Sequence, residues 1–170
     1  MKNRTLIHCM FLLLGIAFLQ SASSFAQNRP VWPHPTSDSL RQQILAQFRL
    51  YYADLTKRDW KAYRSHFWPG ATLTTVWQPT GESTHRVMIT TLDDFIAQAP
   101  LGPDSKPIFA EKMTEADVRA YRNLAHVWAK YDARFGDPGK VMEWKGIDAF
   151  TLMEHDGRWK IVSLSYTDIE

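Results

Sequence analysis

The sequence predicts a single α+β domain in which N-terminal helices pack on an antiparallel sheet. Apolar residues recur at helical spacing between residues 38 and 67. From residue 71 the pattern changes to the period-two alternation of strands, and the last third of the chain consists of such runs separated by short turns. Helices followed by consecutive strands favour an α+β fold over an alternating α/β fold.

The first 26 residues are expected to be a cleavable secretory signal peptide. Lys2 and Arg4 precede an apolar run over residues 6–19, and Ser24 and Ala26 supply small residues at the positions before a cleavage site. The run is shorter than the roughly 20 residues that span a bilayer, which argues against an uncleaved anchor. We therefore expect a periplasmic or secreted protein with no stable membrane insertion after cleavage.

The charge of the remaining chain limits its partners. Without Lys2 and Arg4, 18 basic residues are balanced by 18 acidic ones. A near-neutral protein of this kind gives no support to nucleic-acid binding. Cys9 is the only cysteine and lies in the predicted signal peptide, so the exported chain is expected to have no disulfide and no thiol nucleophile.

Two helices are expected after a proline-rich tether at residues 27–35. Thr36 or Ser37 is expected to cap the first helix, and Asp59 the second, shorter one. The apolar stripe of the first helix consists of Leu40, Ile44, Phe48, Tyr51, Tyr52 and Leu55. The folded domain is predicted to cover residues 36–170.

The strand region is expected to contain several hairpins. A β-branched run over residues 71–77 turns back into a partner strand over 84–90, and Thr91 caps a short helix. Residues 100–107 are rich in proline and are expected to form a loop. Long strands are then expected over 124–135, 141–154 and 159–167, with Gly146 marking a bulge or a bend.

Strand parity predicts an inner and an outer face of the sheet. Trp159 and Ile161 are expected to face the long helix, which would place Val162, Leu164 and Tyr166 on the opposite face. Trp128 is expected on that outer face among charged residues. An apolar patch of this kind usually marks an interface, so we expect a homodimer joined through the outer sheet face.

Three stretches carry a resemblance to a known superfamily. They are "YYADLTKRDWKAYRSHFWPGATL" at the front, and "NLAHVWAKYDARF" and "GIDAFTLMEHDGRWKIVSLSYT" at the back. Together they resemble the opening helices and closing strands of the nuclear transport factor 2-like superfamily, and in particular its SnoaL-like and lumazine-binding-like members. The resemblance covers most of residues 38–167.

The resemblance implies a cone-shaped α+β domain in which N-terminal helices pack on a strongly curved antiparallel sheet, with a pocket between the sheet and the long helix. It does not imply one activity, because the superfamily includes isomerases, dehydratases, cyclases and non-catalytic binding proteins. The catalytic sets of its ketosteroid isomerase and dehydratase members do not map residue by residue onto this chain. The function therefore has to be inferred from the site.

Asp148 and Tyr131 are the candidate catalytic residues. Asp148 shares strand parity with Trp144 and Phe150, and a carboxyl group in an apolar cavity would have a raised pKa and could act as an acid or a base. A bulge at Gly146 would instead turn Asp148 towards solvent. The predicted ligand pocket consists of Tyr52, Tyr63, Trp77, Tyr131, Trp144, Asp148 and Phe150.

Several classes of enzyme find no support in the sequence. The histidines form no pair with metal-ligand spacing, so no metal site is expected. No glycine-rich phosphate loop and no serine nucleophile elbow occur, and we expect no cofactor. Two functions stay open. One is an exported domain that binds a small hydrophobic molecule in an aromatic-lined pocket. The other is a cofactor-free isomerase, dehydratase or cyclase that works by acid–base catalysis.

Overall fold

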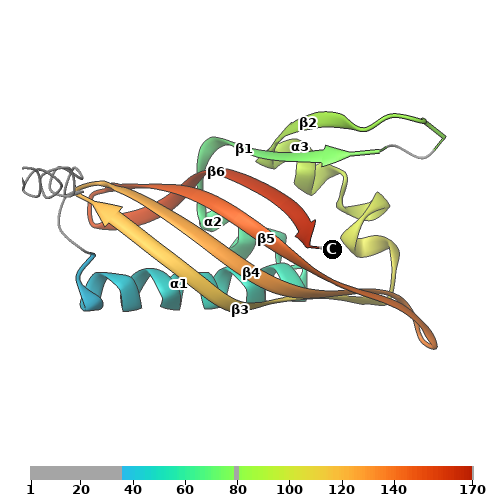
Figure 1. The fold of residues 1–170 in the computed structure, drawn as a ribbon, viewed down its shortest axis with the longest axis horizontal. Helices are drawn as coiled ribbons and strands as arrows, with labels where there is room; N and C mark the ends of the chain where they lie inside the picture. Colours follow the sequence, from blue (N-terminus) through green and yellow to red (C-terminus); the bar gives the residue numbers. More distant parts are fainter. Residues whose placement is uncertain (1–35, 79–80, 170) are drawn as a thin grey trace, which may run out of the picture. The chain divides into compact units, whose positions relative to one another are not determined.

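The structure, a computed structural model, describes residues 36–78 and 81–169. The predicted signal peptide and the proline-rich tether lie outside these residues. The helices are α1 (Asp38–Lys57), α2 (Trp60–Ser65) and α3 (Leu92–Ala97), labelled in Figure 1. The strands are β1 (Phe67–Trp77), β2 (Arg86–Thr91), β3 (Ile108–Tyr121), β4 (Leu124–Asp137), β5 (Lys140–His155) and β6 (Arg158–Ile169). Short 3-10 turns lie at Ala99–Leu101 and Pro103–Ser105. No helix in the described part of the chain is long and apolar enough to cross a membrane.

The helices begin at the capping residues that the sequence indicates. The side chain of Ser37 accepts a hydrogen bond from the backbone N–H of Leu40, and that of Asp59 accepts one from Ala62. Thr91 caps α3 in the same way. Each cap satisfies an N–H group that has no partner within the helix, which fixes where the helix starts.

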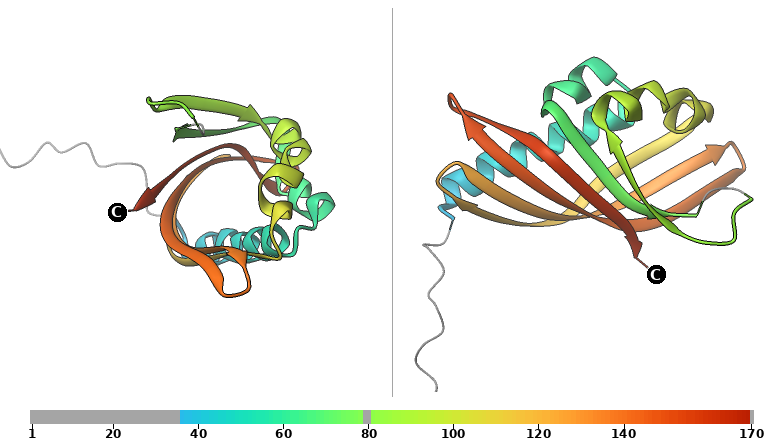
Figure 2. Two further views of the ribbon diagram at one scale, coloured as in Figure 1. Left: turned by 90° about the vertical axis from the view of Figure 1, so that its right-hand side faces the viewer. Right: turned by 90° about the horizontal axis from the view of Figure 1, so that it is seen from above.

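The six strands form one open sheet in the order β2-β1-β6-β5-β4-β3. The sheet curls so that its concave face meets α1 (Figure 2). Four of the five strand pairings are antiparallel, as predicted, but β1 and β6 run parallel. The purely antiparallel sheet of the sequence prediction is therefore corrected to a mixed sheet. Parallel neighbours need a long crossover, and here residues 78–157 provide it.

The alternation of β4 divides the core from the outer surface. Ala125, Val127, Ala129, Tyr131 and Ala133 are buried, whereas the residues between them are exposed. The inward alanines are small, which leaves room for the large aromatic side chains of α1. Phe48 of α1 packs against Phe150 of β5 with ring centroids 4.5 Å apart. The predicted two-faced character of this strand is confirmed.

A bulge in β6 changes which of its residues face the core. Trp159 and Ile161 are buried, as predicted. Leu152 pairs with Ile161 but Thr151 pairs with Ser163, so Val162 is an extra residue and the side-chain parity reverses after it. As a result Leu164 is only 4% exposed and Tyr166 packs against the core. The prediction that these two residues lie on the outer face is wrong.

Candidate functional site

Asp148 is a buried carboxyl group in the aromatic core. It lies on the inner face of β5, between Ala129 of β4 and Tyr166 of β6, and is 4% exposed. The hydroxyl of Tyr52 on α1 donates a hydrogen bond to its Oδ2 over 2.5 Å. Within the described residues, no cationic side chain forms an ion pair with Asp148. An acid buried without a counter-charge is costly, and acids with perturbed pKa values cluster at functional sites.

Gly146 makes room for a tyrosine and does not form a bulge. It pairs in regular register with Tyr131 of β4, and a Cβ atom at Gly146 would overlap the ring and hydroxyl of that tyrosine. The predicted bulge at this position is therefore wrong. Because the register stays regular through Gly146, Asp148 keeps the inward parity of Phe150 and does not turn towards solvent.

The environment of Asp148 favours its protonated form. Burial raises the pKa of its carboxyl group to about 7, although the hydrogen bond from Tyr52 opposes this rise. Burial and the nearby charge of Asp148 raise the pKa of Tyr52 above its ordinary value. Tyr131 also has a raised pKa, because of burial and of the charges of Glu111 and Asp148. The tyrosines therefore stay protonated and can donate hydrogen bonds at neutral pH.

Glu111 is a second acid of the site, and the sequence did not single it out. It lies on β3 opposite Ala133, which faces inward, and is half-buried. Burial, and then the charge of Asp148, raise the pKa of its carboxyl group to about 8. Recognising β3 as a full strand would have revealed it, since Phe109 and Met113, two positions to either side of Glu111, share its inward parity.

A groove of about 680 Å³ between α1 and β3 is lined by Glu111 and by Tyr52, the hydrogen-bond partner of Asp148. Its volume is within the range of small-molecule sites. The groove is lined by Leu45, Arg49, Tyr52, Ala53, Thr56 and residues 110–116, which include Glu111. Tyr52 and Glu111 thus belong both to the groove wall and to the acid–tyrosine cluster, which we define as Tyr52, Glu111, Tyr131 and Asp148.

The structure brings together part of the predicted pocket. Tyr52, Tyr131 and Asp148 lie in the cluster, where the rings of the two tyrosines are 6.4 Å apart. Trp144 is half-buried and shares the cross-strand row of Glu111 through Ala133.

The other predicted pocket residues do not belong to the acid–tyrosine cluster. The hydroxyl of Tyr63 bonds to that of Tyr51 at 3.1 Å within the hydrophobic core. Phe150 packs against Phe48 and Tyr51 in the same core. Trp77 is 57% exposed near the end of β1.

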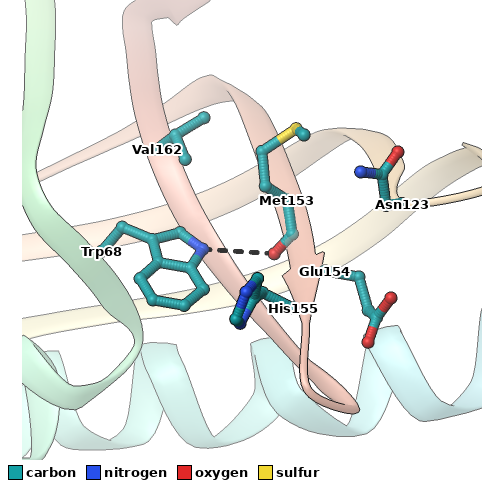
Figure 3. A pocket seen from close by; sticks show the side chains of 6 residues that line it. All are labelled: Trp68, Asn123, Met153, Glu154, His155 and Val162. Carbon is teal, nitrogen blue, oxygen red and sulfur yellow. Dashed lines mark hydrogen bonds between the residues drawn. The ribbon is translucent and has the colours of Figure 1, made fainter.

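A second groove lies on the sheet near the β5–β6 turn (Figure 3). It has a volume of about 380 Å³ and is lined by Trp68, Asn123, Met153, Glu154, His155 and Val162. The indole N–H of Trp68 donates to the carbonyl oxygen of Met153 over 3.3 Å. None of the predicted site residues lines this groove, which is therefore separate from the acid–tyrosine cluster.

The order of helices, the curled six-stranded sheet and the buried aromatic cluster define a nuclear transport factor 2-like fold. The sequence profile of the SnoaL-like domain matches residues 44–167, and the chain belongs to this family. A comparison with curated proteins gave no match.

Solved structures of the same fold come from several bacteria. A nuclear transport factor 2-like protein of unknown function from Shewanella baltica is 18% identical, with a TM-score of 0.56, 79% of this chain covered and 98% of the other. A proposed dehydratase of the same fold family from Streptomyces avermitilis is 13% identical, with a TM-score of 0.62 and coverages of 79% and 99%. A protein of unknown function from Mycobacterium tuberculosis is 11% identical, with a TM-score of 0.62 and coverages of 78% and 73%. At these identities the likeness concerns the fold.

Proposed function

We propose that the protein is a cofactor-free acid–base catalyst that moves a proton on a small, uncharged carbonyl compound. The observation that carries the proposal is the carboxyl group of Asp148, which is buried without a counter-charge and bonded to Tyr52 over 2.5 Å. Glu111 adds a second acid with a pKa near neutrality. General acid–base catalysis is most effective when the pKa values of its groups lie near the working pH. Isomerases and dehydratases both use this chemistry.

The two acids can act together in the conversion of a carbonyl compound to its enol. Between pH values of about 7 and 8, Asp148 is mainly ionised and Glu111 mainly protonated. Glu111 on the groove wall donates its proton to the carbonyl oxygen of the substrate. Tyr52 accepts a proton from the neighbouring carbon and passes its own to Asp148. The products are an enol, a protonated Asp148 and an ionised Glu111, and the reverse transfers regenerate the starting state.

Deuterium uptake tests this function without knowledge of the natural substrate. We expect the protein to accelerate exchange of the α-hydrogens of a small ketone, with 2-tetralone as the first probe, in D2O followed by proton NMR. The rate is expected to pass through a maximum between about pH 7 and 8, since one acid must be ionised and the other protonated.

Asp148→Asn and Tyr52→Phe are each expected to lower the exchange rate by about 100-fold or more. Asp132→Asn is the matched control, because Asp132 is an exposed aspartate on β4. Equal exchange by the wild-type protein and the Asp148→Asn variant would contradict the proposal.

A non-catalytic binding protein is the second candidate function, and the apolar part of the groove wall supports it. Leu45, Ala53 and Met113 line the groove beside the acids. A pure binder needs the shape of the groove but not the proton transfer. This function would be favoured over catalysis if the wild-type protein and the Asp148→Asn variant both bind 2-tetralone and the wild type gives no deuterium exchange.

Export to the periplasm or the medium is proposed from residues 1–26. We expect the mature protein to begin at Gln27, because Ser24 and Ala26 provide the small residues of a cleavage site after a short apolar run. N-terminal sequencing of the protein from the periplasmic fraction checks this. An intact N-terminus recovered from the membrane pellet would contradict it.

A homodimer through the outer sheet face is also proposed. Leu164 and Tyr166 no longer support it, so it rests on Trp128, which is 57% exposed, and on its neighbours in the same row, Ala149 and Ser165. Aromatic residues are enriched at the centres of protein interfaces, so the exposed indole of Trp128 can anchor a second sheet. We expect sedimentation equilibrium to give a dimer for the wild type and a monomer for Trp128→Glu. Leu164→Glu is unsuitable for this test because it would place a charge in the core.

A further inference from the structure

Thr56 of α1 forms hydrogen bonds with both the N–H and the C=O group of Glu111. The backbone N–H of Glu111 donates to Oγ1 of Thr56 over 2.9 Å, and the hydroxyl of Thr56 donates to the carbonyl oxygen of Glu111 over 2.8 Å. β3 is an edge strand, so its outward N–H and C=O groups have no partner strand. The hydroxyl of Thr56 therefore satisfies the two backbone groups of Glu111 that a neighbouring strand would otherwise bond.

The same helix also carries Tyr52, which is bonded to the other acid, Asp148. Tyr52 and Thr56 are four residues apart on α1 and consequently lie on the same face of the helix, one turn apart. Tyr52 bonds to Asp148 on β5, and Thr56 bonds to Glu111 on β3. One turn of α1 thus bonds to both acids, although the strands that carry them are not neighbours in the sheet.

We propose that Thr56 is a positioning residue, which holds Glu111 against the groove so that it can act with Tyr52 and Asp148. The proposal rests on the proposed acid–base function. Other contacts between α1 and β3 can keep the two elements together, but the paired hydrogen bonds fix the position of Glu111 relative to α1. A displacement of about 1 Å at such a site can cost about 100-fold in rate.

The test compares Thr56→Val with Thr56→Ser. Valine keeps the shape of threonine but loses both hydrogen bonds, whereas serine keeps the hydroxyl. In a carbon-13 NMR titration of the glutamate carboxyl groups, we expect the pKa of Glu111 to fall from about 8 towards its ordinary value in Thr56→Val and to stay high in Thr56→Ser. Deuterium exchange into 2-tetralone should fall by about 10- to 100-fold in the valine variant only.

Thr36→Val is the matched control. Thr36 does not line the groove, and its hydroxyl oxygen accepts a hydrogen bond from the backbone N–H of Ala120 on the same strand β3 over 2.7 Å. Its loss should leave the pKa of Glu111 and the exchange rate unchanged. A Thr56→Val variant that melts earlier but keeps the wild-type pKa of Glu111 would show a purely structural role and overturn the inference.

Failure of this inference can be separated from failure of the proposed function. If Asp148→Asn abolishes exchange while Thr56→Val does not, the catalytic proposal stands and the positioning role falls. If the wild-type protein gives no exchange, the catalytic proposal falls. The titration of Glu111 in the three threonine variants then still decides whether Thr56 holds that residue in place.

Discussion

Replacing Asp148 with asparagine is expected to make the protein more stable above neutral pH and to lose this advantage in acid. The folded protein raises the pKa of Asp148 from 3.8 to about 7. Between these two values the unfolded chain has released the proton that the folded chain still holds. Stability from this group is therefore fully present below about pH 4 and falls as the pH rises to about 7. Three pKa units correspond to about 4 kcal/mol, as an order of magnitude.

Asparagine cannot ionise, so in the variant this position does not lower the free energy of unfolding as the pH rises. Its amide oxygen can still accept the hydrogen bond from Tyr52. Urea unfolding of both proteins at pH 4 and pH 8 measures the effect, since groups common to both cancel in the comparison. Asp132→Asn, at an exposed aspartate of β4, is again the control for replacing a carboxylate with an amide. A difference between wild type and Asp148→Asn that is the same at both pH values would show that Asp148 titrates normally.

Gly146→Ala is expected to destabilise the protein by about 3 kcal/mol, at the upper end of the range for overpacking. The added Cβ would occupy the space of the Tyr131 ring and hydroxyl. Without that conflict, alanine in a strand would be more stable than glycine by about 0.5–1 kcal/mol. The sign of the change measured by urea unfolding therefore distinguishes a glycine that makes room for a side chain from one that merely tolerates a bend.

The double variant Gly146→Ala/Tyr131→Ala isolates this contact. Once the ring is gone, the added methyl group has space, so the two changes should not be additive. Additive losses would indicate that the ring and the glycine do not share the space. Displacement of Tyr131 in the single variant should also disturb the neighbouring ring of Tyr52, which lies 6.4 Å away.

Local chemistry made much of the fold predictable. Ser37, Asp59 and Thr91 are polar residues in front of apolar periodic runs, and each one caps a helix. The inward face of β4 follows from strict alternation without a break. Such features depend on a few neighbouring residues, so a single sequence contains them.

Features that depend on distant parts of the chain were not predictable in this way. The extra residue at Val162 reverses the parity of β6, and nothing near it in the sequence marks the bulge. The role of Gly146 depends on Tyr131, which belongs to another strand. Asp148 was found because its strand is apolar. The inward parity of Glu111 follows from β3 itself, but its contact with α1 through Thr56 joins residues 55 positions apart in the chain. Tertiary contacts decided each of these cases.

The parallel pairing of β1 with β6 constrains the time at which the domain can fold. Leu73 of β1 lies beside Leu164 of β6, and the hairpin of β1 and β2 has no other strand neighbour in the sheet. An isolated hairpin is at best marginally stable in water, and closing so long a loop slows folding. A chain emerging from the ribosome therefore cannot complete this sheet until β6 has been synthesised. Until then β1 and β2 lack the strand that joins them to the other four, and the domain stays incompletely folded.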